Sequence, residues 1–188
     1  MAAACRSPSR SAALITLTEA ASLSEAQPVV RPDLKFVYAH PAHSIAFAGG
    51  VGLAPFAPGT FGTLLAFPLF ALLAPYTDAV TQLGVCVVLF ALGAWACHVT
   101  GRALGVSDHG GMVWDETVAF LLVLVFTPAG WPWQVAAFAL FRFFDIVKPP
   151  PIRHFDRTLK SGFGVMFDDL LAAGYTLLVL ALVKTLIE

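Results

Sequence analysis

Charged residues are scarce in this sequence. They make up 12% of its 188 residues, whereas a typical soluble domain carries about 25%. Hydrophobic residues make up 58%, and the mean hydropathy is +0.79. A small water-soluble protein must cover a large surface with polar groups, and this chain has too few of them. We therefore expect lipid around much of the folded chain.

Cysteine is also scarce, with three residues in the chain. Cys86 and Cys97 share one apolar stretch, and a helix would hold them roughly 16 Å apart, too far for a disulfide. No cysteine pair has the spacing of zinc ligands. The net charge of −1 gives no indication of a nucleic-acid partner.

The N-terminal residues differ in composition from the rest. Residues 1–35 are rich in Ala, Ser, Pro and Arg and contain no sustained apolar run. This composition predicts a disordered extension over residues 1–44, followed by one membrane domain over residues 45–188. An organelle-targeting role of the extension is the weaker alternative.

Five apolar segments follow, and none alternates apolar and polar positions as a strand would. They cover residues 60–75, 79–104, 113–127, 132–147 and 165–187. The second and the last reach the roughly 20 residues that a membrane span needs, and the others are shorter. We therefore expect an all-α fold, a compact polytopic membrane bundle of five or six helices.

Basic residues occur in alternate connections between these segments. The connections near 76–78 and 128–131 contain none, whereas the others contain Arg31, Lys35, Arg102, Lys148, Arg153, Arg157 and Lys160. The positive-inside rule places the basic connections in the cytoplasm. The chain is then a multi-pass protein whose N-terminus lies inside.

Polar side chains gather at the helix ends predicted to face the cytoplasm. They include Gly59-Thr60, His109, Asp115, Glu116, Arg142, Asp145, Lys148, Asp168 and Asp169. One acidic residue in a first helical turn is explained by the helix dipole, but two adjacent acidic pairs in apolar surroundings are not. Five clustered carboxylates repel one another unless a proton or a cation intervenes. Oxygen ligands favour Mg²⁺ before calcium or manganese.

The basic residues near Asp145 suit a phosphate ligand. Arg142, Lys148 and Arg153 bracket that carboxylate, and arginine binds phosphate oxygens in bidentate fashion. Attraction to anionic lipid is the alternative for Arg157 and Lys160. Backbone N–H groups of segment 49–63, ahead of a helix that starts near Gly59-Thr60, also suit an anion. His109 is a candidate acid or ligand.

Three sequence blocks, in this order, resemble the phosphatidylglycerophosphatase A family. They are GVGLAPFAPGTFGT at 50–63, DHGGMVWDE at 108–116, and FRFFDIVKPPPIRHFDR with GFGVMFDD at 141–157 and 162–169. The likeness covers residues 45–188. It implies magnesium-dependent hydrolysis of phosphatidylglycerophosphate to phosphatidylglycerol and phosphate in the inner membrane.

The resemblance also implies roles for individual residues. The acidic positions, as metal ligands, are Asp115, Glu116, Asp145, Asp168 and Asp169. The basic positions, as phosphate ligands, are Arg142, Lys148 and Arg153, to which the residue pattern adds Gly59, Thr60 and His109. Catalysis is assigned to Asp145, Lys148, Arg153, Asp168 and Asp169. The nucleophile is left open between water and an aspartate carboxylate.

A small ion-coupled membrane transporter is the alternative function, because intramembrane carboxylates also mark ion paths. Transporters place such groups near the bilayer midplane, whereas the predicted topology gathers them at one end. A CDP-alcohol phosphotransferase would need a spaced Asp-Gly and Ala-Arg motif that this sequence lacks. We expect a phospholipid substrate and a membrane environment, and the sequence does not give the oligomeric state.

Overall fold

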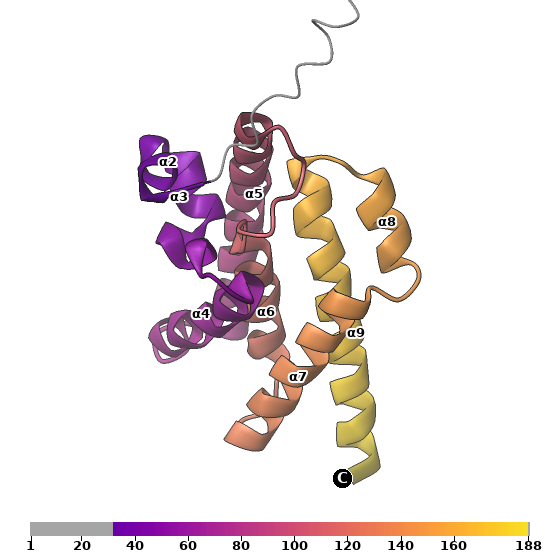
Figure 1. Ribbon diagram of the computed structural model, residues 1–188. Coiled ribbons are helices and arrows are strands. Elements are labelled where there is room, and N and C mark those ends of the chain that lie inside the picture. The colour runs from indigo at the N-terminus through magenta and orange to yellow at the C-terminus, as the bar shows by residue number, and fades with distance from the viewer. Residues whose placement is uncertain (1–31, 188) are drawn as a thin grey trace, which may run out of the picture. The chain divides into compact units, whose positions relative to one another are not determined.

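The computed structural model describes residues 32–187, and every regular element within that range is helical (Figure 1). Five of these helices correspond to the five predicted apolar segments: α4 (Pro58–Leu73), α5 (Ala79–Leu104), α6 (Trp114–Phe126), α7 (Trp131–Val147) and α9 (Gly162–Ile187). The all-α prediction is confirmed for the described part of the chain.

The predicted number of five or six helices is wrong. Residues 32–187 form nine helical elements, because four short ones join the five long helices. The short elements are α2 (Leu34–Ala39), α3 (Pro41–Ala46), the 3-10 element η1 (Ala48–Leu53) and α8 (Ile152–Thr158). Each has six or seven residues, too few to show an apolar stripe in the sequence.

Caps and burial stabilise α2 and α3. The Asp33 side chain accepts a hydrogen bond from the Phe36 backbone N–H at 2.8 Å, and His40 Nδ1 accepts one from the Ala42 N–H at 3.1 Å. Val37 and Ala42 are fully buried. Residues 1–31 of the predicted extension lie outside the described residues. Residues 32–44 contain α2 and most of α3 where disorder was predicted.

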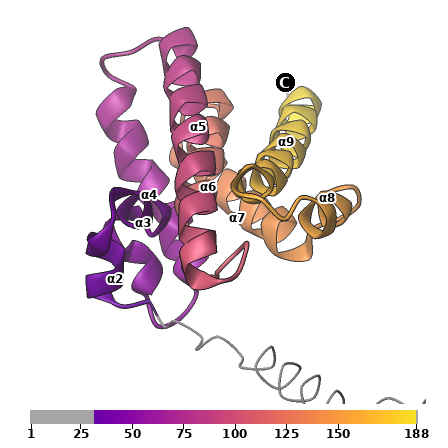
Figure 2. The same cartoon turned by 90° about the horizontal axis from the view of Figure 1, so that it is seen from above.

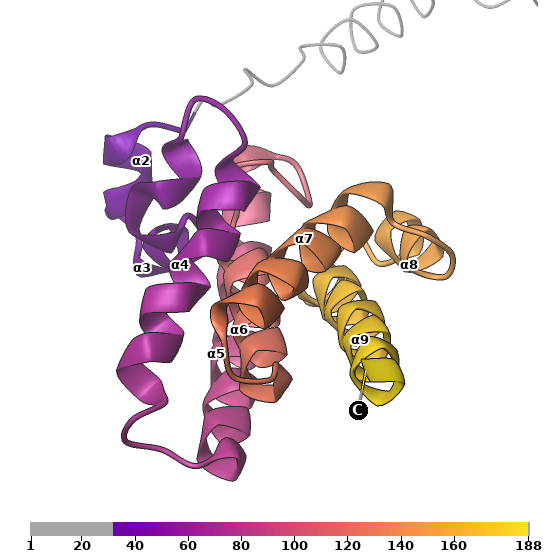
Figure 3. The ribbon, with the colours of Figure 1, turned by 90° about the horizontal axis from the view of Figure 1, so that it is seen from below.

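Helices α6 and α9 organise the packing. Helix α6 contacts α4, α5, α7 and α9, and α9 also contacts α5, α7 and α8. Helix α6 therefore lies between α4 and α9 (Figures 2 and 3). Phe120, Leu121 and Leu124 of α6 and Phe141 of α7 are at most 1% exposed and form the centre of the core.

The C-terminal end of α5, which carries Arg102, and the segment from Lys148 to Lys160 lie at the same end of the bundle. Helix α9 starts beside the C-terminal half of α5: a Cβ on Gly162 would stand 2.2 Å from the Ala94 carbonyl oxygen. Connection 105–113, which follows α5, and the turn before α9 therefore lie close together, whereas α9 ends at the opposite end (Figure 1). This common end also holds the acidic residues described below.

Helices α5 and α9 both carry exposed apolar side chains along their length. Each has 26 residues, with a mean hydropathy of 2.0 and 2.1 over its most apolar window, so both are long and apolar enough to cross a membrane. Val80, Val87, Leu178 and Leu182 on these helices are all more than half exposed. Such large apolar patches mark contact with lipid or a partner, and these two helices suit lipid.

Candidate active site

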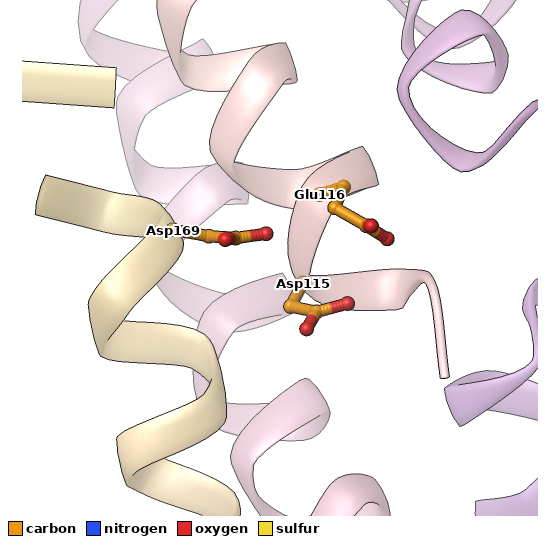
Figure 4. A group of neighbouring side chains, drawn as sticks. All are labelled: Asp115, Glu116 and Asp169. Carbon is orange, nitrogen blue, oxygen red and sulfur yellow. The ribbon is translucent and has the colours of Figure 1, made fainter. Parts of the chain in front are cut away.

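Three carboxylates from two helices meet at this end of the bundle. Asp115 and Glu116 lie in the first turn of α6, and Asp169 lies in the second turn of α9. Each contributes an oxygen, and these oxygens lie within 4.8 Å of one another (Figure 4). Asp115 is 7% exposed and Asp169 is 3% exposed, so water solvates them poorly. We call Asp115, Glu116 and Asp169 the carboxylate triad.

Local contacts fix the start of α6, where two of these residues lie. The Val113 N–H donates to the Ala46 carbonyl at 2.9 Å, and the Thr117 hydroxyl donates to the Gly62 carbonyl of α4 at 2.8 Å. The Trp114 indole N–H donates to the Leu89 carbonyl of α5 at 3.2 Å. The first turn of α6 is thus held by three neighbouring elements, which limits where Asp115 and Glu116 can lie.

Arg142 of α7 joins the triad to a fourth carboxylate. Its Nη1 lies 3.4 Å from Glu116 Oε1 and 2.6 Å from Asp145 Oδ2. Nη1 also donates to the Thr63 hydroxyl of α4 at 3.4 Å. Gly59 lies against the same group, because a Cβ there would stand 2.0 Å from Glu116 Oε1. Helices α4, α6 and α7 therefore meet around one guanidinium.

Lys148 forms a second ionic contact at this end. It ends α7 with a left-handed backbone (φ 45°), and its ammonium contacts Asp168 of α9 and Asp156 of α8, the latter at 2.9 Å. Burial opposes the charged ammonium, but the hydrogen bonds to Asp168 and Asp156 outweigh it and raise the pKa of Lys148. Burial likewise opposes the charged Asp156, but Lys148 lowers the pKa of that carboxyl. The ion pair is therefore charged at neutral pH.

Several buried polar atoms at this end have no hydrogen-bond partner within residues 32–187. They are Asp115 Oδ1, Glu116 Oε2, Asp168 Oδ1, Asp169 Oδ2 and Arg142 Nε. Buried carboxylate oxygens are normally paired, because leaving them bare is costly. Three of these oxygens belong to the triad, and oxygen ligands at this spacing fit a hard divalent cation such as Mg²⁺.

The structure brings most of the predicted site residues together, but not all of them. Asp115, Glu116 and Asp169 form the triad, Asp145 and Asp168 each lie against a basic side chain, and Gly59 lies against Glu116. The predicted set of five metal ligands is thus divided between the triad and two ion pairs.

Three predicted residues form no hydrogen bond or ion pair with the triad within the described residues. Arg153 is exposed on α8 and makes no ion pair with any described residue. His109 Nδ1 accepts a hydrogen bond from the Gly111 N–H at 3.0 Å, which closes a turn. The Thr60 hydroxyl makes no hydrogen bond within the described range. Their predicted roles stay predictions.

Asp156, which pairs with Lys148, was not among the site residues predicted from the sequence. It lies within the block at 141–157, eight residues after Lys148. Its neighbours Arg153 and Arg157 are exposed, so the segment resembles a solvated surface turn. Its place inside a sequence block that already supplied Asp145 and Lys148 is the signal that could have indicated it.

Comparison with known proteins relates the chain to one family. The family model described as Phosphatidylglycerophosphatase A matches residues 44–184. A Phosphatidylglycerophosphatase A of Haemophilus influenzae is 45% identical over 149 residues, which cover 79% of this chain and 91% of the relative. A Phosphatidylglycerophosphatase A of Escherichia coli is 41% identical over 138 residues, which cover 71% of this chain and 77% of the relative.

A third relative carries a different name. A protein of Bacteroides thetaiotaomicron, named as a candidate phosphatidylinositol-3-phosphatase, is 42% identical over 146 residues, which cover 73% of this chain and 90% of the relative. No solved structure matches the chain significantly. All three names describe phosphatases that act on a phosphorylated phospholipid headgroup.

Proposed function

This chain belongs to the phosphatidylglycerophosphatase A family, and we propose that it hydrolyses phosphatidylglycerophosphate to phosphatidylglycerol and inorganic phosphate. The observation that carries this proposal is the carboxylate triad, which lies beside two basic side chains at one end of an apolar helical bundle. A site of this kind suits a phosphorylated headgroup whose acyl chains remain in lipid.

The triad is our proposed magnesium site. Its three carboxylates and their unpaired oxygens suit Mg²⁺, and Asp145 and Asp168, also predicted as ligands, adjoin it. A bound Mg²⁺ supplies positive charge that polarises the phosphoryl group and offsets the charge on its oxygens. The same charge relieves the repulsion among the carboxylates.

Two basic side chains are placed to bind the phosphate. Arg142 has five N–H donors, of which the Nε donor is unpaired within the described residues. Lys148 has three donors, and two of them face carboxylates. These cations would stabilise the charge that the transferred phosphoryl oxygens carry. Arg153, exposed at the same end, is proposed as a further phosphate ligand.

We place the protein in the inner membrane, multi-pass, with the site facing the cytoplasm. The apolar surfaces of α5 and α9 support membrane insertion. The basic connections lie at the end that holds the triad, and such connections stay in the cytoplasm. The transporter considered from the sequence has no support from the relatives, whose names describe phosphatases.

A substrate comparison tests this function. The purified chain in detergent micelles is given phosphatidylglycerophosphate or phosphatidylinositol 3-phosphate, with Mg²⁺ or with excess EDTA, and released phosphate is measured. We expect turnover of phosphatidylglycerophosphate that requires Mg²⁺ and a lower kcat/KM for the phosphoinositide. Faster hydrolysis of the phosphoinositide would reassign the substrate, and full activity in EDTA would remove the metal from the proposal.

A further inference from the structure

Lys148 is held between carboxylates of two different helices. Its ammonium contacts Asp168, which is 4% exposed, and Asp156, which lies 2.9 Å away on α8. The Lys148 backbone N–H donates to the Phe144 carbonyl at 2.9 Å, so the residue is anchored to the end of α7 as well. The flexible lysine side chain is therefore held at its ammonium as well as at its backbone.

The contact between Lys148 and Asp168 is linked to the triad by the sequence of α9. Asp168 and Asp169 are consecutive residues, and consecutive side chains on a helix point about 100° apart. Asp168 faces the Lys148 ammonium, whereas Asp169 faces Asp115 and Glu116. The ammonium therefore contacts the residue that precedes Asp169, and the Asp169 carboxylate acts on its charge.

The ammonium keeps one donor for a ligand. It carries three N–H groups, and the two carboxylates account for two of them. Its third N–H makes no hydrogen bond within the described residues. Where the remaining N–H points depends on both carboxylates, since one contact alone would let the ammonium rotate about it.

We propose that Asp156 is a positioning residue, which together with Asp168 orients the Lys148 ammonium so that its third N–H binds a phosphate oxygen of the substrate. This inference rests on the proposed function. Removing the Asp156 charge has two opposite effects: it lessens repulsion of an anion, and it frees the ammonium. The Asp156 side chain is 30% exposed, so solvent screens part of the repulsion, and we expect the loss of orientation to dominate.

The test uses inorganic phosphate as the probe, in detergent micelles with Mg²⁺ present. Its dissociation constant is measured from the phosphate-dependent rise in Tm, and its inhibition constant from turnover of phosphatidylglycerophosphate. Asp156→Asn should weaken both by about tenfold, the lower end for a hydrogen bond to a charged group. Asp156→Glu should restore most of the loss. Arg157→Gln, which removes a charge from an exposed site on the same helix, should match wild type.

A double-mutant cycle separates positioning from a direct or purely structural role. If Asp156 acts through Lys148, Asp156→Asn should cause no further loss of phosphate affinity in a Lys148→Ala background. Additive losses, or wild-type phosphate affinity in folded Asp156→Asn, would overturn the inference. A wild-type chain that binds phosphate but releases none from the lipid would overturn the proposed function and leave the phosphate-affinity arm to decide the role of Asp156.

Discussion

Gly59 and Glu116 lie so close that no side chain fits between them. A Cβ on Gly59 would stand 2.0 Å from Glu116 Oε1 and 3.2 Å from Arg142 Nη1. The first turn of α4 thus closes against the carboxylate that joins the triad to Arg142. The glycine at this position places a backbone where a side chain would displace a proposed ligand.

Gly59→Ala should therefore impair activity more than folding. The Glu116 carboxylate is the end of a flexible side chain, so it can move aside, but it then leaves the triad. We expect kcat/KM to fall about 10²-fold, the loss associated with misplacing a group by roughly 1 Å. Gly84→Ala is the matched control, because its Cβ meets nothing within 4 Å. Phosphate release is the measurement, and equal activity of the two variants would contradict the assignment.

Arg142 should matter for stability as well as for phosphate binding. Its guanidinium pairs with Glu116 and Asp145, whose side chains are 14% and 11% exposed. Arg142→Met leaves both carboxylates without that cation, and breaking a buried pair typically costs about 3–5 kcal/mol. Metal-free protein should lose this stability in thermal or denaturant unfolding, and Mg²⁺ should restore part of it. A loss no larger than that of the exposed Arg157→Met would refute this role.

The long helices could be predicted because their signal is local. The predicted apolar segment 79–104 coincides with α5. The ends of the other four predicted segments differ from the ends of their helices by at most three residues. The short helices could not be predicted from the sequence. Helices α2 and α3 depend on caps by Asp33 and His40 and on burial of Val37 against other elements. Those partners are set by the tertiary fold.

The candidate site was predictable in composition but not in its pairing. The acidic residues could be assigned to one end of the bundle from the order of the apolar segments. The different partners of Asp168 and Asp169 could not be predicted, because they depend on the rotation of α9 about its axis. They also depend on where α8 places Asp156 after the proline turn.

Membrane orientation can be tested by cysteine labelling. In a chain whose three native cysteines are replaced, Ala129→Cys should react with an impermeant reagent in intact cells and Arg157→Cys should not. Both positions are exposed, and Ala129 is preferred to Gly130, whose φ of 117° disfavours a side chain. Both should react after the membrane is permeabilised. Labelling of position 157 but not 129 in intact cells would invert the proposed topology.

The most direct test of the account is whether the triad holds Mg²⁺. Thermal unfolding is measured with and without Mg²⁺ for wild type, Asp169→Asn and Asp168→Asn, alongside phosphate release. Mg²⁺ should stabilise wild type, by about 2.7 kcal/mol at a concentration of 100 Kd. Asp169→Asn should lose this stabilisation and all turnover, yet unfold without metal at the wild-type Tm or above it, because one repelling charge is gone. Asp168→Asn should keep most of the stabilisation. An undiminished magnesium shift in folded Asp169→Asn, with turnover retained, would contradict the account.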